Sequence, residues 1–154
     1  MYKRILLPLN GSAQARHALP HAIAQAKRFG AELVLLEVLS PSLGMHGLEK
    51  GSREWVSRYK TNLARENLQD AAAEAQQRGV RVKMSTAEGH APTRIVEFAE
   101  ENDVDLIVMS THGRSGLSRW LIGSVADRVL RGAKVPVLLV RTENGDRLEE
   151  KRGE

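Results

Sequence analysis

Apolar strand-like runs alternate with helical patterns along most of the chain. Five runs predict strands, at residues 2–9, 32–39, 80–86, 104–109 and 135–140. Between them, apolar residues recur every three or four positions, which predicts helices that begin near residues 13, 53, 92 and 124. Strands and helices in strict alternation predict an α/β domain with a parallel sheet covered by helices on both faces.

Local signals define the ends of these helices. Ser12 is placed to cap the first helix, Pro20 is expected to kink it, and Gly30 ends it. Residues 124–127, Ser-Val-Ala-Asp, resemble a capping box at the start of the last helix. The long second helix is expected to face inward with Val56, Tyr59 and Leu63 and then, after a small register shift, with Leu68, Ala71, Ala72 and Ala75.

The apolar content of the strands predicts their order. The first, second and fourth strands are apolar throughout, as expected of strands covered on both faces. The third strand alternates apolar and polar residues, and the fifth contains Pro136, which cannot donate a hydrogen bond to a central ladder. An open doubly wound sheet with the strand order 3-2-1-4-5 satisfies both constraints and leaves the fifth strand as an apolar edge, where a second copy could pair.

This order also predicts where a ligand binds. The first and fourth strands become neighbours whose connections leave on opposite sides, so a crevice forms at their carboxyl ends. The segments that line it are residues 8–12 and residues 110–124. The second segment is rich in glycine and hydroxyl side chains and leads directly into a helix, an arrangement typical of a phosphate-binding loop.

Composition excludes several classes of protein. The chain of 154 residues has no cysteine, which excludes disulfides and thiolate chemistry and agrees with a cytoplasmic location. The net charge is +4, but the basic residues are scattered and aromatic residues make up only 4%, so we expect no nucleic-acid binding. We expect no membrane span and no metal-ligand set, and residues 142–154 are expected to form a polar tail after a domain at residues 1–141.

The loop residues resemble a known family. Residues 5–12 after the first strand, residues 35–38 in the second, and residues 110–140 with Gly113, Gly123 and Ser124 are similar to the universal stress protein family. The ATP-binding branch of that family has the motif G-x2-G-x9-G-[ST], whose second glycine matches Gly113 and whose end matches Gly123 and Ser124. The first motif glycine is replaced here by Ser110, and the aspartate usual after the first strand is replaced by Asn10.

The resemblance implies a role for each residue at the crevice. The phosphates would be held by Gly113, Gly123, Ser124 and the amide of Val125. The adenosine would be held by Pro8, Asn10 and the backbone of Val38, and Met109 and Ser110 would lie beside the ribose. His112 is expected to position a ligand, and Arg114 to add positive charge at the phosphates. The full set of expected binding residues is Pro8, Asn10, Val38, Met109, Ser110, His112, Gly113, Arg114, Gly123, Ser124 and Val125.

Two functions remain open from the sequence. The first is a stress-response protein that binds an adenine nucleotide, ATP or alternatively AMP or ADP, with Mg²⁺ as a companion of the phosphates, and acts as a switch or sensor. The second is a dimeric interaction module of the same fold that binds no nucleotide, with Ser110 and Asn10 as the marks of a weakened site. Since no catalytic base is evident, we expect no more than slow ATP hydrolysis. Either protein would be a homodimer through residues 135–140.

Overall fold

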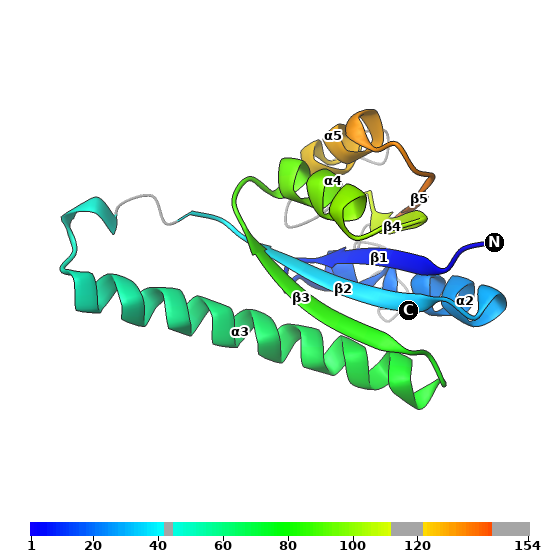
Figure 1. Cartoon of the computed structure of the whole chain (residues 1–154), viewed down its shortest axis with the longest axis horizontal. Helices are drawn as coiled ribbons and strands as arrows, with labels where there is room; N and C mark the ends of the chain where they lie inside the picture. The colour runs from blue at the N-terminus through cyan, green and yellow to red at the C-terminus, as the bar shows by residue number, and fades with distance from the viewer. Residues whose placement is uncertain (42–44, 112–121, 143–154) are drawn as a thin grey trace, which may run out of the picture.

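A five-stranded parallel sheet forms the centre of the molecule (Figure 1). We analysed a computed structural model that describes residues 1–41, 45–111 and 122–142. The strands lie in the order β3-β2-β1-β4-β5, which confirms the predicted order and the predicted central position of β2, β1 and β4. The strands are β1 (Arg4–Leu9), β2 (Glu32–Leu39), β3 (Val82–Glu88), β4 (Leu106–Ser110) and β5 (Val137–Val140).

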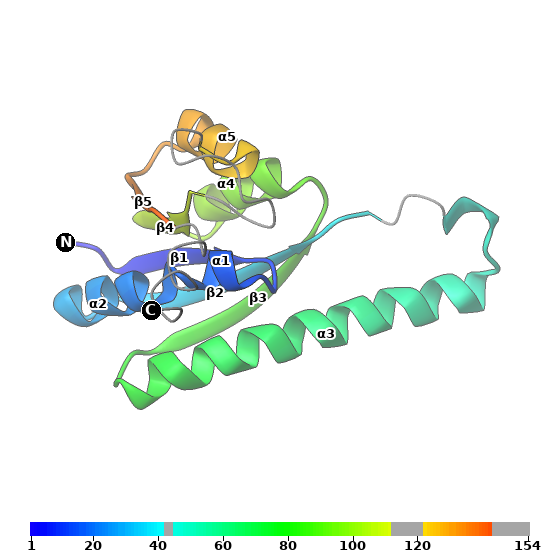
Figure 2. The same cartoon turned by 180° about the vertical axis from the view of Figure 1, so that it is seen from behind.

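Helices cover both faces of this sheet. One face packs against α1 (Ala13–Arg16), α2 (Leu19–Phe29) and the second half of α3 (Lys50–Gln77). The other face packs against α4 (Ala91–Glu101) and α5 (Ser124–Gly132), as the two opposite views show (Figure 1, Figure 2). A single 3-10 turn, η1 (Met45–Gly47), precedes α3. No helix in the described part of the chain is both long and apolar enough to span a bilayer.

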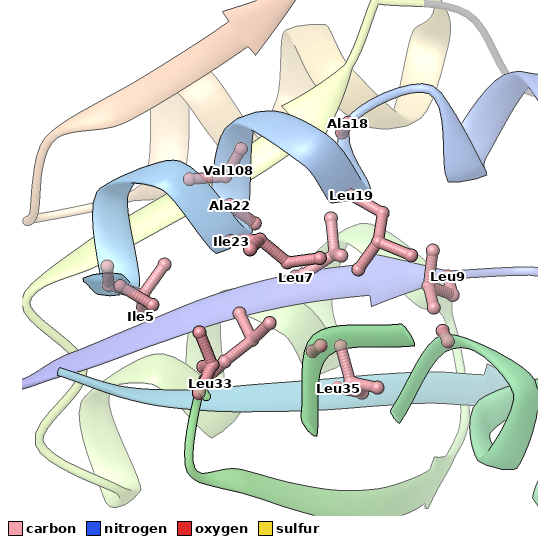
Figure 3. Packing of buried hydrophobic residues seen from close by; sticks show 14 of the residues in the cluster. Ile5, Leu7, Leu9, Ala18, Leu19, Ala22, Ile23, Leu33, Leu35 and Val108 are labelled. Atoms are coloured by element: carbon pink, nitrogen blue, oxygen red, sulfur yellow. The ribbon is translucent and has the colours of Figure 1, made fainter. Parts of the chain in front are cut away.

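The side chains of each central strand divide between two apolar cores. Ile5 and Leu7 of β1 point into the core beneath α2 and α3, and Leu6 between them points into the core beneath α4 and α5. Figure 3 shows the first of these cores, with β1 and β2 side chains packed against α2. Because a strand buried on both faces needs apolar side chains at every position, the apolar runs predict these central strands correctly.

Asp105 fixes the start of β1 next to the start of β4. Its carboxylate oxygen Oδ2 accepts hydrogen bonds from the backbone N–H of Lys3 at 2.7 Å and of Arg4 at 2.9 Å. The hydrogen bond from Lys3 is the largest cause that lowers the pKa of Asp105 below its usual value of 3.8. The contact holds the two central strands together at the end opposite the crevice.

Three details of the helices differ from the prediction. Pro20 does not kink one helix; instead, α1 and α2 are separate, and Pro20 lies in the first turn of α2, where its missing N–H costs no hydrogen bond. The capping box is absent, because Gly123 occupies the N-cap position and Ser124 is the first helical residue. Tyr59 and Leu63 do not face inward: they are exposed. By contrast, Ser12 caps α1 and Gly30 ends α2 as expected.

Candidate functional site

A cavity of about 280 Å³ lies at the carboxyl ends of β1 and β4, where the order of the sheet reverses. Its lining comes from six elements of the chain: the ends of β1, β2 and β4, the first turns of α4 and α5, and α1. The residues are Pro8, Leu9, Asn10, Ala15, Val38, Ala91, Ile95, Met109, Ser110, Thr111, Gly123, Ser124, Val125 and Ala126. The predicted crevice is therefore a real cavity in the fold.

The turn after β1 forms one side of the cavity. The side-chain oxygen of Asn10 accepts a hydrogen bond from the backbone N–H of Ser12 at 3.0 Å, and the Ser12 hydroxyl accepts one from the N–H of Ala15 at 3.1 Å. Gly11 between them has a φ of +77°, a conformation that glycine adopts without strain. These contacts hold the Asn10 side chain in a defined position at the cavity.

Backbone hydrogen bonds place the start of α5 on the opposite side. The N–H of Gly123 donates to the carbonyl of Thr111 at 2.6 Å, and the N–H of Thr111 donates to the carbonyl of Val140 at 2.9 Å. The hydrogen bonds inside α5 begin with the N–H of Asp127, which donates to Gly123 at 2.9 Å. The N–H groups of Ser124 and Val125 precede that bond, so the helix supplies no acceptor for them and its positive end borders the cavity.

Apolar side chains form the remainder of the wall. Val38, Ile95, Met109 and Ala126 come from four different elements, and all but Val38 are buried. A wall of this kind accommodates a flat apolar surface such as an aromatic ring, whereas the backbone groups near α5 suit an anion. The cavity thus combines an apolar side with a polar, partly positive side.

One polar contact joins the two helices that border the cavity. The Arg128 guanidinium on α5 lies 3.2 Å from Nε2 of His90, the residue before α4, and Nδ1 of His90 lies 3.1 Å from the Thr93 hydroxyl. Because a guanidinium can only donate, Nε2 of His90 accepts and Nδ1 carries the proton in this arrangement. Sequence reasoning missed this contact, since nothing in the pattern relates residue 90 to residue 128.

The structure brings together all of the expected binding residues that it describes. Pro8, Asn10, Val38, Met109, Ser110, Gly123, Ser124 and Val125 all line the one cavity. His112, Gly113 and Arg114 lie outside the described residues, as does the tail after residue 142.

Leu9 and Thr111 also line the cavity and lie in the two segments that the strand order predicts at the crevice. Sequence reasoning missed four further lining residues, Ala15, Ala91, Ile95 and Ala126. A signal for Ala91 and Ile95 was available, because a helix that follows a parallel strand starts at the same edge of the sheet as the crevice.

Comparison with known proteins decides the family. The model of the universal stress protein family matches residues 1–141. The chain belongs to this family. Universal stress protein MJ0531 of Methanocaldococcus jannaschii is 41% identical over 143 residues, which cover 92% of this chain and 83% of that protein.

Solved structures of other universal stress proteins share the fold. The structure of MJ0577 from the same archaeon has a TM-score of 0.77 and 32% identity, and the match covers 94% of this chain and 99% of MJ0577. The universal stress protein from Archaeoglobus fulgidus in complex with dAMP has a TM-score of 0.62 and 25% identity, with 90% of this chain and 97% of that chain covered.

Proposed function

We propose that this universal stress protein binds an adenine nucleotide, ATP in particular, in the cavity between the ends of β1 and β4. The observation that carries the proposal is the convergence of eight expected binding residues, from distant parts of the chain, on one cavity. In this proposal the nucleotide acts as the signal of a cytoplasmic switch or sensor, and residues 1–141 are the binding domain.

The chemistry of the cavity supports a nucleoside with its phosphates. The adenine ring would lie against the apolar wall that includes Val38 and Ile95, and the ribose beside Met109 and Ser110. The phosphates would accept hydrogen bonds from the N–H groups at the start of α5, where the helix dipole favours negative charge. The described cavity of about 280 Å³ is near the lower end of the range for small-molecule sites, about 300–1,000 Å³.

The Asn10 side chain suits the ribose better than a metal ion. A hydrogen bond from the N–H of Ser12 holds this side chain at the cavity, and an amide group can both accept from and donate to a ribose hydroxyl. Among residues 1–41, 45–111 and 122–142 no three His, Asp or Glu side chains cluster as metal ligands. Mg²⁺ would therefore be held mainly by the phosphates, as is common for this ion.

Two measurements test the proposal. Small molecules released from the purified, denatured protein are separated by chromatography, and melting is followed with and without millimolar ATP. At a ligand concentration of a hundred times Kd, binding adds about 2.7 kcal/mol to the free energy of unfolding, which raises Tm by about 5–10 °C for a domain of this size. No released nucleotide together with no shift would refute the proposal and favour the interaction module without nucleotide.

The exposed edge of the sheet supports a homodimer. β5 is the last strand of the sheet, and Val137, Leu138 and Leu139 are only half-buried. An apolar edge of this kind invites pairing with another strand, and we expect two copies to pair through it. Sedimentation analysis at micromolar concentration tests the expectation, and a monomer would contradict it.

A further inference from the structure

Helix α3 carries an apolar surface that no part of its own sheet covers. The buried residues of the helix begin only at Ala64, and its first half extends beyond the sheet in both views (Figure 1, Figure 2). In this half Trp55 is 66% exposed, Tyr59 is 57% exposed and Leu63 is 47% exposed. The rings of Trp55 and Tyr59 stack, with centroids 5.6 Å apart and planes 9° from parallel.

This surface points away from the sheet. Successive residues of an α-helix are rotated by about 100°, so the direction of Trp55, Tyr59 and Leu63 differs by about 160° from that of the buried residues of the second half. Glu66 and Asp70 continue the exposed face at the same helical spacing, and both are exposed. The outer face of α3 therefore changes along its length from aromatic and apolar to acidic.

The charges of the helix change in the same direction. In residues 50–63 four basic side chains stand against one acidic one, and in residues 64–77 three acidic side chains stand against one basic one. The basic residues of the first half are Lys50, Arg53, Arg58 and Lys60, and the acidic residues of the second half are Glu66, Asp70 and Glu74. At 100° per residue, Arg58 and Lys60 lie about 100° to either side of the outer face and flank it, whereas Lys50 and Arg53 point further away from it. A second copy in the opposite direction therefore brings these two flanking cations near the Glu66 and Asp70 carboxylates of the outer face.

We propose that the outer face of α3 is a self-association surface, on which the α3 helices of two copies pack antiparallel about a two-fold axis near Leu63. This arrangement brings Arg58 within reach of the partner's Glu66 and sets Leu63 against the partner's Leu63. The axis sets residue 55 level with residue 71 of the partner, so the indole of Trp55 lies about half a turn from the partner's Ala73, a small exposed residue that leaves room for it. Because the sheet covers the opposite side of each α3, the two sheets lie on the outside of the pair and do not collide.

An anionic membrane is a poorer occupant of the same surface. The aromatic residues and the basic first half would suit a lipid interface, but Glu66 and Asp70 lie on the same face and would be repelled by anionic lipids. Nucleic acid meets the same repulsion. A second copy uses both halves of the helix, and two-fold symmetry makes each favourable contact occur twice.

A charge exchange between Arg58 and Glu66 tests the arrangement. These two residues are eight positions apart on the helix, about 12 Å along its axis, so they cannot pair within one chain. We expect Arg58→Glu and Glu66→Arg each to weaken the association about tenfold to a hundredfold, because opposite charges become like charges at two symmetric places. The double variant restores the pair in reversed form and is expected to return within about threefold of the original dissociation constant.

Sedimentation equilibrium at low salt measures the mass of the assembly for the original chain, the two single variants and the double variant. The matched control for charge is Arg28→Glu, on the exposed surface of α2. At a protein concentration where the original chain and the control are fully associated, each single variant is expected to show half their mass. This outcome is independent of pairing through β5 and of nucleotide binding, since no variant alters either place. An identical mass for all four chains would overturn the proposal.

The same variants distinguish the other occupants. If α3 bound vesicles with phosphatidylserine or single-stranded DNA, Arg58→Glu would weaken that binding and Glu66→Arg would strengthen it. The double variant would bind about as well as the original chain, because the two effects add. Single variants with opposite effects would therefore also overturn the proposal. The absence of cysteine allows a second measurement, because Leu63→Cys introduces a single thiol at the proposed axis. A short bis-maleimide is expected to link two Leu63→Cys chains, but not two chains with Arg28→Cys.

Discussion

Replacement of Val125 by proline removes one backbone N–H from the wall of the cavity while α5 keeps its ability to form. Val125 is the second residue of α5, and the hydrogen bonds within the helix begin only with the N–H of Asp127. The helices α2 and α4 of this same chain have Pro20 and Pro92 at the equivalent second position. The Val125 side chain is 36% exposed, so its loss removes little packing.

The expected effect is on the phosphates alone. A hydrogen bond to a charged group is worth about 1.5–3 kcal/mol, so Val125→Pro is expected to weaken ATP binding about tenfold to a hundredfold. Adenosine lacks the phosphates and is expected to bind the variant and the original chain equally well. The variant Val125→Ala keeps the N–H and is expected to bind ATP like the original chain.

Isothermal titration calorimetry with ATP and with adenosine measures both effects on the same preparations. An unchanged ATP affinity in a folded Val125→Pro chain would refute the role of the α5 N–H groups. An equal loss for ATP and adenosine would also refute it, because it would show that the variant disturbs the cavity as a whole. The melting temperature of the variant without ligand, expected within a few degrees of the original, shows that the fold is intact.

Two further changes test the local structure by thermal or denaturant unfolding. Asp105→Asn is expected to lower the free energy of unfolding by about 2 kcal/mol at neutral pH, because a charged acceptor of two backbone N–H groups at the start of β1 is lost. The pKa of Asp105 is lowered in the folded chain, so its contribution to stability is present above the unfolded pKa and is lost as the pH falls through the folded pKa. The difference in the free energy of unfolding between the original chain and Asp105→Asn is therefore expected to shrink below about pH 4. A difference that grew at lower pH would contradict this reasoning. Gly11→Ala is expected to destabilise by about 1–3 kcal/mol, since φ is +77° and a Cβ would lie 2.9 Å from Nδ2 of Asn67. As its control, Gly51→Ala in α3 meets no atom within 4 Å and is expected to stabilise by up to about 1 kcal/mol; equal effects of the two changes would refute the argument.

The sequence predicts the sheet well because strands that are buried on both faces have uninterrupted apolar runs. The apolar runs of β1, β2 and β4, the alternating pattern of β3 and the single residue Pro136 were enough to order five strands, and the structure confirms the order. Pro136 lies just before β5 rather than within it, and its carbonyl accepts from the N–H of Ile107 at 3.0 Å. β5 is therefore shorter than the predicted strand at residues 135–140, since proline can accept a hydrogen bond but cannot donate one.

The candidate site was predictable to the extent that it depends on the order of the strands. The ends of β1 and β4 supply Asn10 and Ser110, and a chain with this order must bring them together. The contact of His90 with Arg128 was not predictable, because it depends on how α4 and α5 pack across the other face of the sheet. Local sequence contains no information on such a contact between side chains of two separate helices.

The prediction for α3 was right for its second half, where Leu68, Ala71, Ala72 and Ala75 are buried, and wrong for Tyr59 and Leu63 in its first half. A spacing of three and four residues identifies an apolar face, but it does not say whether the domain's own core covers that face. Tyr59 and Leu63 have the spacing of core residues and are exposed, while small residues such as Ala64 and Ala71 make the contact with the sheet. The size of the side chains was a poor guide here, because the close approach of a helix to a sheet favours alanine.

The central position of β1 determines the order in which the sheet can be completed during synthesis. β1 pairs with β2 on one side and with β4 on the other. The ribosome makes β4 about a hundred residues after β1, which takes about 5–20 s at typical rates of synthesis. Until then one edge of β1 and the face that α4 and α5 later cover are open to other chains. The nascent protein therefore passes through a stage in which a buried central strand is half-paired, and this stage, rather than the finished fold, is where it is most exposed to aggregation.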